Sequence, residues 1–237
     1  MRVSFVIPAY NESSIIKDTM SACQRYLREH YEDYELVIVD DHSSDDTLNI
    51  ARGCADTRTV VHTYPEHSGK GRAVREGMLK ATGDIIVCTD ADLAYGLDVI
   101  DGAVKKAQNA DIVIGSRRLH PEGYASYTRM RYIASRIFAA IVSLFSGLNY
   151  DTQCGFKCFK KAAAQRVFSL CRTDGFAYDF EAIMLANKLG YGIEQYPVSI
   201  INHRKSKVRL VRDALRMLRD IIKIRASVRK TIREVKL

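Results

Sequence analysis

Ile85-Ile86-Val87-Cys88-Thr89-Asp90-Ala91-Asp92 is the stretch around which the rest of the chain is organised. Its first four residues are apolar and mostly β-branched, as in a central strand covered on both faces. Because side chains alternate along a strand, the carboxylates of Asp90 and Asp92 converge just past its carboxyl end. Two carboxylates held close repel unless a cation lies between them, usually Mg²⁺ or Mn²⁺. An isolated Asp-x-Asp is more often a solvated strand end, so the rest of the sequence must decide.

The composition fits one large globular domain or two small ones. The chain has 237 residues and is 47% hydrophobic, which is enough for a substantial core. It contains no run of about 18 apolar residues, so no helix is expected to span a bilayer. The chain enters a strand at residues 3–7 without a charged leader, so no secretory signal is expected. The six cysteines form no Cys-x-x-Cys pair, and reduced thiols in a cytosolic compartment are the favoured interpretation.

The net charge of +8 is unevenly distributed. Residues 202–237 contain 13 Lys and Arg against 3 Asp and Glu, whereas residues 1–201 contain 23 against 25. A basic tail of this kind favours an anionic surface, either nucleic acid or the lipid head groups of a cytosolic leaflet.

The first half of the chain alternates strands with helices. Strands are expected at 3–7, 35–39, 59–63, 85–88 and 111–115, with helices at 13–29, 46–54, 72–82 and 97–109. Pro8 is expected to end the first strand, and Ser13 or Ser14 to cap the first helix. The alternation predicts an α/β fold with a mostly parallel sheet and helices on both faces.

The second half is less regular. We expect a helix at 127–146, a strand-like segment after the turn at 155–157, a helix at 179–189, a strand at 192–201 and a helix from 208 onward. No linker marks a second domain. We therefore predict one domain over residues 1–207, followed by a C-terminal helix over residues 208–237 that belongs to the domain or is appended to it.

Polar residues follow three of the expected strands. They are Tyr10, Asn11 and Glu12, then Asp40 and Asp41, then Asp90 and Asp92, with Lys70, Arg72 and Arg117 as nearby cations. The carboxyl ends of parallel strands line one edge of a sheet, and this edge suits a metal-bound phosphate with the base and sugar held by the outer acids. The alternative is that each Asp caps the next helix. We favour capping for Asp45 or Asp46, but not for Asp41 and Asp92.

Five motifs in this order resemble the inverting glycosyltransferases of family 2. They are Pro8-Ala9-Tyr10-Asn11-Glu12, Val39-Asp40-Asp41-x-Ser43-x-Asp45, Gly69-Lys70-Gly71, Asp90-Ala91-Asp92 and Gly115-Ser116-Arg117. The resemblance implies the Rossmann-like GT-A fold and a nucleotide-sugar donor. It places Pro8, Tyr10, Glu12 and Asp41 at the base and ribose, and Lys70 beside the nucleotide. It also places Asp90 and Asp92 on a Mg²⁺ or Mn²⁺ ion that holds the diphosphate. Ala9, Asp40 and Ala91 are expected in the same donor site.

Later motifs are similar to dolichyl-phosphate glucosyltransferases and related polyprenyl-phosphate glycosyltransferases. They are Asp151-Thr152-Gln153-Cys154-Gly155-Phe156-Lys157-x-Phe159, Phe176-Ala177-Tyr178-Asp179-Phe180-Glu181 and Arg204-x-Ser206-Lys207-Val208. The resemblance implies UDP-glucose as donor and a polyprenyl or dolichyl phosphate as acceptor. One departure is Ala94, where the dolichyl-phosphate mannose synthases have Gln. It implies fewer protein ligands for the metal and gives less support to mannosyl transfer.

The acceptor site is also implied by the resemblance. Arg117, Arg131 and Ser135 would hold the acceptor phosphate, with Gln153 in the same site, and Arg204 and Lys207 would close over the phosphates. The expected catalytic residues are Asp92, Arg117, Asp179 and Glu181. A hydroxyl acceptor would require Asp179 or Glu181 as a base, whereas a phosphate is already ionised and needs no strong base.

Two helices have an amphipathic pattern that fits a membrane surface. The first has an apolar face at Ile133, Ile137, Phe138, Ile141 and Leu144 between arginines, and ordinary core packing explains it equally well. In the last helix, Val211, Leu215, Leu218 and Ile222 form an apolar stripe beside a basic strip. Such a helix either lies in a membrane interface or packs on the core with a solvated basic face. We favour the interface, which predicts a protein peripheral on the cytosolic face of a membrane.

Two other functions are considered. A family 2 transferase acting on a sugar or protein hydroxyl would need no membrane. A nucleotide-binding or nucleic-acid-binding module would use the basic tail, but the expected strand ends are acidic where a nucleic-acid surface should be basic. The chain also lacks Gly-x-Gly-x-x-Gly, which disfavours an NAD-dependent oxidoreductase. No nucleic-acid partner is expected.

Overall fold

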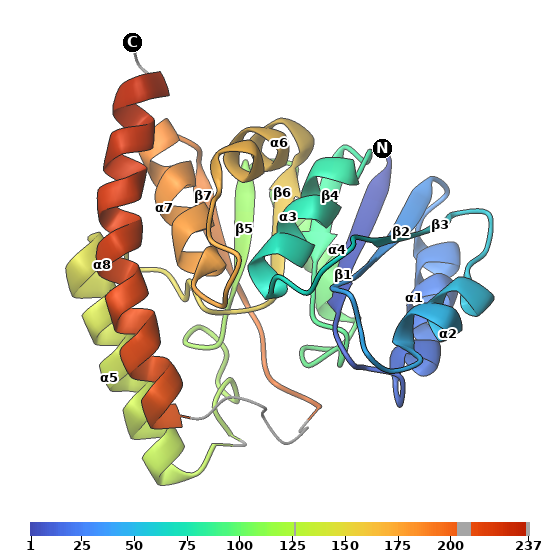
Figure 1. Cartoon of the computed structure of the whole chain (residues 1–237), viewed down its shortest axis with the longest axis horizontal. Helices are drawn as coiled ribbons and strands as arrows, with labels where there is room; N and C mark the ends of the chain where they lie inside the picture. Colours follow the sequence, from blue (N-terminus) through green and yellow to red (C-terminus); the bar gives the residue numbers. More distant parts are fainter. Residues whose placement is uncertain (126, 203–209, 236–237) are drawn as a thin grey trace.

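A computed structural model describes residues 1–125, 127–202 and 210–235 of the chain. In this part, a sheet of seven strands has the order β3-β2-β1-β4-β6-β5-β7 (Figure 1). The strands are β1 Val3–Ala9, β2 Tyr34–Asp40, β3 Thr59–Thr63, β4 Ile85–Cys88, β5 Ile112–Ser116, β6 Lys157–Lys160 and β7 Ile193–Pro197. Only β6 runs antiparallel to its neighbours among these strands. The predicted mostly parallel sheet is therefore confirmed.

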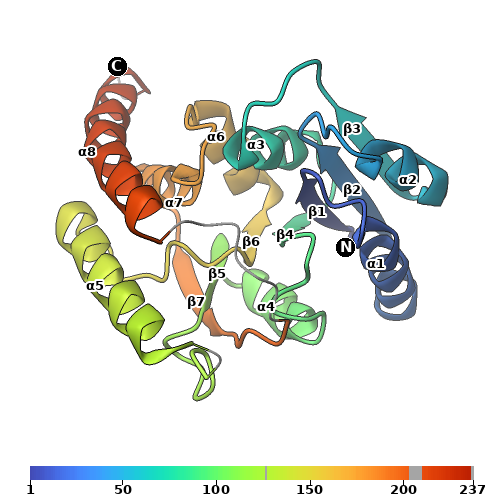
Figure 2. The same ribbon diagram turned by 60° about the horizontal axis from the view of Figure 1, so that its bottom comes forward.

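Helices cover both faces of the sheet, as Figure 2 shows from a second side. They are α1 Ile16–His30, α2 Thr47–Cys54, α3 Lys70–Lys80, α4 Val99–Ala107, α5 Arg129–Ser146, α6 Lys161–Leu170, α7 Tyr178–Leu189 and α8 Leu210–Val235. The two helices α5 and α8 contact each other and lie side by side at one end of the molecule. The helix α6 was not predicted, although its buried residues Ala163, Ala164, Val167 and Phe168 have helical spacing.

Two hydrophobic cores follow from the alternation of side chains along the strands. Val6, Val37 and Ile86 face the layer that contains α3, α6, α7 and α8. Their neighbours Phe5, Ile38 and Val87 face the opposite layer, which contains α1 and α4. The central strands are thus buried on both sides, and their polar residues appear only where the strands end.

The first strand continues through Pro8 to Ala9, so the prediction that Pro8 ends it is wrong. The carbonyl of Val6 accepts from Thr89 N on the β4 side, and the carbonyl of Ala9 accepts from Asp41 N on the β2 side. Pro8 is two residues after Val6, so its backbone nitrogen points toward β4, as the carbonyl of Val6 does. The ladder with β4 ends at the pair Val6–Cys88, so the missing proline amide leaves no carbonyl of β4 unsatisfied.

The first helix begins at Ile16, later than predicted, and neither Ser13 nor Ser14 caps it. The cap position is Ile15, which forms no side-chain capping bond. Instead, the carbonyl of Glu12 accepts hydrogen bonds from the amides of Ile15 and Ile16, both at 2.9 Å. Residues 10–15 therefore remain a loop at the sheet edge, which leaves their side chains near the end of β1.

The two amphipathic helices differ in what their apolar residues contact. In α8, Ile221, Ile224 and Val228 are buried in the core beside α7, whereas Ile222, from the predicted apolar stripe, is 58% exposed. The side chains of Val211, Leu215 and Leu218 lie outside the described residues. No helix in the described part is both long and apolar enough to cross a membrane. Among the described side chains of α5, Met130 is 79% exposed, Ile133 52%, Ile137 56% and Leu144 81%. The side chains of Phe138 and Ile141, which the predicted apolar face also includes, lie outside the described residues.

Candidate active site

The loops after β1, β2 and β4 meet at one edge of the sheet. Asn11, His42 and Leu93 lie in these loops, and they are the three non-glycine residues of the described chain with positive φ, at 53°, 54° and 47°. A left-handed backbone is unfavourable for such residues and is retained mainly where the surrounding structure requires it. All three lie where the sequence predicts the donor site.

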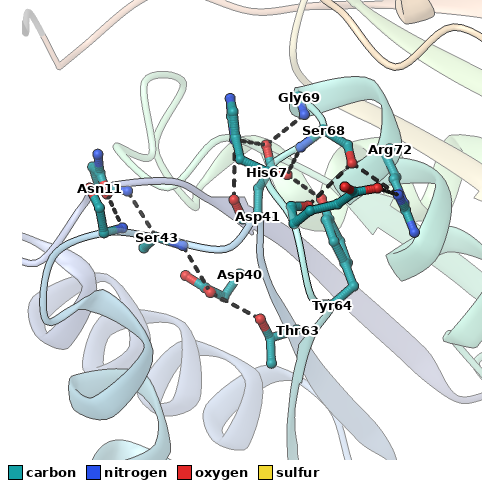
Figure 3. A network of polar contacts seen from close by, with 12 residues as sticks. Asn11, Asp40, Asp41, Ser43, Thr63, Tyr64, His67, Ser68, Gly69 and Arg72 are labelled. Carbon is teal, nitrogen blue, oxygen red and sulfur yellow. Dashed lines mark hydrogen bonds and ion pairs between the residues drawn. The ribbon is translucent and has the colours of Figure 1, made fainter.

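Asp41 anchors the loop of residues 64–69 (Figure 3). Its Oδ1 accepts from Tyr64 OH at 2.5 Å and Ser68 N at 2.9 Å. Its Oδ2 accepts from Gly69 N at 2.9 Å and pairs with His67 Nδ1 at 3.0 Å. The side chain is only 2% exposed. Burial and the Asp41 carboxylate together raise the pKa of Tyr64. Four partners use the full acceptor capacity of one carboxylate, so Asp41 positions this loop.

Asp40 supports the same edge from inside the protein. It is fully buried, and its Oδ2 accepts from Ser43 N at 3.2 Å and Thr63 OH at 3.1 Å (Figure 3). Its Oδ1 has no hydrogen-bond partner among the described residues. The structure therefore places Asp40 beneath the predicted donor site, where it fixes the turn after β2.

Tyr10 provides the exposed aromatic surface of this edge. The residue is 38% exposed, and its ring stacks on the His67 ring, with centroids 4.0 Å apart and an interplanar angle of 23°. Pro8, Ala9 and Ala91 are buried, and Glu12 is half-buried. The amide of Asn11 donates to Ser43 Oγ in the loop after β2, and the amide of Glu12 donates to Thr47 Oγ1 at the start of α2. The predicted base and ribose residues are thus brought together at one edge.

Lys70 and Asp90 form an ion pair beside this edge. Lys70 is the first residue of α3, and its Nζ lies 2.5 Å from Oδ1 of Asp90. Burial disfavours the charged ammonium, but the carboxylates of Asp90 and Asp179 outweigh it and raise the pKa of Lys70. The other oxygen of Asp90 faces Gly155, where a Cβ atom would lie 2.4 Å from Oδ2. Glycine at position 155 therefore makes room for the Asp90 carboxylate.

Asp92 is the second member of the predicted metal pair. Its Oδ1 accepts from Ala94 N at 3.1 Å. Burial and the neighbouring Asp90 carboxylate raise its pKa. The predicted strand at 192–201 ends at Pro197, and the chain then crosses to the loop after β4, where Asn202 Nδ2 donates to the carbonyls of Asp92 and Leu93. This crossing braces the loop that carries both aspartates.

Glu181 binds the backbone of the loop that precedes α7. It is 2% exposed, and its Oε2 accepts from Arg172 N at 3.0 Å and Thr173 N at 2.7 Å. The same loop contacts the start of α3, where Gly71 N donates to the carbonyl of Asp174 at 2.7 Å. The described contacts of Glu181 thus assign it to positioning this loop and, through the loop, the start of α3.

Asp179 is paired with a buried lysine that the sequence analysis did not single out. Lys157 Nζ contacts Oδ1 of Asp179 and the carbonyl of Cys154. The two side chains are 4% and 7% exposed. Burial raises the pKa of Asp179, and the nearby Lys157 and Lys70 oppose this. Asp179 therefore lies in a chain of alternating charges that runs from Lys157 to the pair of Lys70 and Asp90.

Arg117 is also engaged, in a bidentate pair with Asp151. Its Nε donates to Oδ2 at 2.9 Å and its Nη2 to Oδ1 at 2.7 Å, while Nη1 donates to Tyr127 OH at 3.2 Å. Burial opposes ionisation of Asp151, but Arg117 outweighs it and lowers the pKa of Asp151. The guanidinium is therefore fixed at the end of β5 and is already neutralised.

A basic cavity of about 560 Å³ lies beside Arg117. It is lined by Arg117, Arg118, His120, Tyr124, Tyr132 and Arg136, among others. Ser135 is half-buried on α5, the helix that also carries Tyr132 and Arg136. Gln153 has a buried Nε2 without a hydrogen-bond partner in the described residues. The side chain of Arg131, and all of Arg204 and Lys207, lie outside the described residues.

The comparisons with known proteins identify the family. A family model described as Glycosyl transferase family 2 matches residues 4–168. The chain belongs to glycosyl transferase family 2. It is therefore an enzyme, and the family predicted from the five motifs is confirmed.

Two relatives of this family 2 enzyme are dolichyl-phosphate beta-glucosyltransferases. The protein from Saccharomyces cerevisiae is 30% identical over 248 residues, which cover 95% of this chain and 74% of the yeast protein. The human protein is 30% identical over 243 residues, which cover 94% of this chain and 75% of the human protein.

Solved structures confirm the GT-A fold. Mannosyl-3-phosphoglycerate synthase from Rubrobacter xylanophilus is 20% identical, with a TM-score of 0.67 over 100% of this chain and 76% of that protein. Glucosyl-3-phosphoglycerate synthase from Mycobacterium tuberculosis, in complex with Mn²⁺, UDP and glucosyl-3-phosphoglycerate, is also 20% identical. Its TM-score is 0.67 over 96% of this chain and 79% of that protein.

Several residues of the site were missed by the sequence analysis. Asp151 and Lys157 lie within a motif that was recognised, but their partners Arg117 and Asp179 are 34 and 22 residues away. Tyr64 and His67 lie in a loop with no recognisable motif. The acidic Asp151 and the basic Lys157 inside a recognised motif could have indicated ion pairs with distant residues, because buried charges require partners.

Proposed function

We propose that this family 2 enzyme transfers glucose from UDP-glucose to a polyprenyl or dolichyl phosphate, with inversion at the anomeric carbon. The relatives named dolichyl-phosphate beta-glucosyltransferase support this substrate pair, because the alignments span nearly the whole chain and about three quarters of each relative. The observation that carries the proposal is that the basic cavity is lined by Tyr132 and Arg136 of α5, the helix on which Met130, Ile133, Ile137 and Leu144 are exposed. A lipid phosphate presents this combination of an anion and an apolar chain.

Asp90 and Asp92 are the proposed ligands of a divalent metal ion. Their carboxylates lie at the end of β4, and Gly155 leaves space beside Asp90 Oδ2 that a Cβ atom would fill. Hard oxygen ligands of this kind suit Mg²⁺ and Mn²⁺. The structural neighbour with bound Mn²⁺ and UDP supports a metal here. When bound, the ion would neutralise charge on the donor diphosphate. Either Mg²⁺ or Mn²⁺ is compatible with this donor set.

The proposed reaction is a single displacement. An oxygen of the acceptor phosphate attacks the anomeric carbon of the glucose, and the bond from this carbon to the diphosphate breaks. Lys70 stabilises the charge on the leaving UDP. The attacking phosphate is already ionised, so Asp179 is not required as a base. This agrees with the contact between Asp179 and Lys157, which neutralises the carboxylate. Tyr10 and the loop anchored by Asp41 would hold the base and ribose.

The proposed acceptor phosphate site is the basic cavity. Because Asp151 neutralises Arg117, the remaining positive or ionisable groups that line the cavity are Arg118, His120 and Arg136. Arg118 donates to the side chain and carbonyl of Asn149, while Arg136 is exposed. We assign the acceptor phosphate to Arg118 and Arg136 in addition to the predicted Arg117, Arg131 and Ser135. Gln153 is a further candidate donor.

The proposed membrane-facing surface is the exposed apolar stripe of α5, formed by Met130, Ile133, Ile137 and Leu144. Successive members are three, four and seven residues apart, so they lie along one side of the helix. Apolar side chains beside cations favour an anionic membrane interface. Because α8 packs on the core, we give it only a secondary role in membrane binding. The six cysteines are free, which agrees with a peripheral position on the cytosolic face.

A donor and acceptor screen tests the proposed function. The enzyme is incubated with Mg²⁺ or Mn²⁺, with UDP-glucose, UDP-N-acetylglucosamine or GDP-mannose, and with a short polyprenyl phosphate or a simple glycoside. We expect glucosyl polyprenyl phosphate from UDP-glucose, and no product when the metal is chelated. Product from the glycoside alone would instead support the family 2 alternative that acts on a hydroxyl. If no combination gives product, the proposed function is wrong.

A further inference from the structure

Lys70 forms an ion pair with a carboxylate oxygen of Asp90 that the proposed metal ion would need as a ligand. Its Nζ is 2.5 Å from Oδ1 of Asp90, and the two side chains are 26% and 29% exposed. The ion pair therefore lies at the accessible rim of the site, where a ligand can reach it. Asp90 is thus neutralised by a cation of the chain itself.

The backbone that carries Lys70 is fixed on both sides. Gly71 N donates to the carbonyl of Asp174 at 2.7 Å. A Cβ atom at position 69 would lie 2.6 Å from the same carbonyl, and one at position 71 would lie 2.4 Å from the carbonyl of Thr173. The start of α3 thus packs directly against the loop of residues 172–175. The lysine stem has four flexible carbons, so the ammonium group of Lys70 can take a second position while its backbone stays in place.

The proposed metal site has few protein ligands. In the described parts of the chain, no group of three or more His, Cys, Asp or Glu residues is arranged to hold a metal ion. Mg²⁺ prefers about six oxygen ligands and usually takes several of them from substrate phosphates and water. A carboxylate that is already paired with an ammonium group is a weaker ligand, because a second cation is repelled by the first.

We propose that Lys70 is a displaceable cation, which holds Asp90 in the free enzyme and moves to the diphosphate oxygens when the donor binds. This inference rests on the proposed donor and metal site. Lys70 releases Asp90 only when the diphosphate offers it another anion, so the nucleotide and the metal bind with positive coupling. The coupling is reciprocal, since each ligand raises the affinity for the other by the same factor.

Manganese binding, measured by electron paramagnetic resonance with and without UDP, tests the proposal. For the natural enzyme we expect UDP to tighten Mn²⁺ binding by about tenfold or more, within the usual range of coupling. In Lys70→Met, Mn²⁺ alone should bind about tenfold more tightly than it binds the natural enzyme, and the effect of UDP should shrink by a similar factor. Lys70→Arg should retain the coupling. Lys80→Met, at the exposed far end of α3, is the matched control and should behave as the natural enzyme.

The proposal is overturned if Mn²⁺ without UDP binds Lys70→Met no more tightly than it binds the natural enzyme. Thermal unfolding verifies that the variant is folded, and Lys70→Gln provides a second neutral side chain. Failure of the proposed function has a different signature. In that case the natural enzyme itself would not bind UDP-glucose, or would form no polyprenyl product, whatever the substitution at Lys70 does to Mn²⁺ binding.

Discussion

A Cβ atom on Gly155 would lie 2.4 Å from Oδ2 of Asp90. Gly155→Ala therefore forces the carboxylate to rotate away from the end of β4. We expect affinity for Mn²⁺ in the presence of UDP to fall by about 10–100-fold, as for other residues that orient a metal ligand. The unfolding midpoint should change little, because the displaced atom is the end of a side chain. Titration of Mn²⁺ with UDP present, together with thermal unfolding, measures both quantities.

Gly53→Ala is the matched control for this substitution. A Cβ atom at Gly53, in α2, would meet no atom within 4 Å. The substitution should leave metal affinity unchanged and stabilise the helix slightly, because alanine has the higher helix propensity. If Gly155→Ala behaved in the same way as Gly53→Ala, Asp90 would not be a metal ligand.

The strand that carries Asp90 could be predicted closely from the sequence. Residues 85–88 and 59–63 were predicted as strands with the bounds that the structure shows, because short apolar or β-branched runs end at polar residues. Side-chain partners could not be predicted in this way. The groups that occupy the Asp41 carboxylate come from residues 64–69, and Asp151 reaches Arg117 across 34 positions. Such pairs depend on how loops pack, and one sequence has no local signal for that.

Lys157 and Asp179 should be strongly coupled in stability. Removing one partner leaves the other as a buried charge, so Lys157→Met and Asp179→Leu should each lower the free energy of unfolding by about 3–5 kcal/mol. The double variant replaces both charges with apolar groups and should recover most of this loss. Chemical denaturation of the four proteins gives the coupling energy. Additive losses would contradict a direct buried pair.

Asp41→Ala should release the loop of residues 64–69. The substitution leaves Tyr64 OH and the amides of Ser68 and Gly69 without their acceptor. We expect those amides to exchange their hydrogens faster and the KM for UDP-glucose to rise, because this loop leads into Lys70. Tyr64→Phe removes a single donor and should cost only about 1–3 kcal/mol of stability. Unchanged hydrogen exchange at Ser68 and Gly69 would show that the loop does not depend on Asp41.

The exposed stripe of α5 should control binding to membranes. A carboxylate at Ile137 or Leu144 cannot enter the apolar part of an interface without a large desolvation cost. The double variant Ile137→Glu and Leu144→Glu should therefore lose sedimentation with vesicles that contain anionic lipid, while binding of UDP-glucose is retained. Leu79→Glu makes the same change at a residue on α3 that is 39% exposed, and it should sediment as the natural enzyme does. Equal sedimentation of both variants would exclude α5 as the contact.

Acid should weaken a network at the opposite end of the strands, where Glu35 is buried. Its Oε1 accepts from Ser4 Oγ at 2.5 Å and Thr82 N at 2.6 Å, and its Oε2 pairs with Arg2 at 3.1 Å. Burial raises the pKa of Glu35, but these donors outweigh it, so the pKa is lowered overall.

A carboxylate whose folded pKa is lowered stabilises the protein above its unfolded pKa, which is about 4.3 for glutamate. This contribution is lost as the pH falls through the lower, folded value. At pH 7, Glu35→Gln should therefore be less stable than the natural enzyme by about 2 kcal/mol, since hydrogen bonds to a charged group are removed. Below pH 4 the difference should shrink, because the natural glutamate also becomes neutral. Denaturation curves across this range decide the point, with the exposed Glu29→Gln as control. A difference that stays constant from pH 7 to pH 3 would show that the charge of Glu35 contributes nothing.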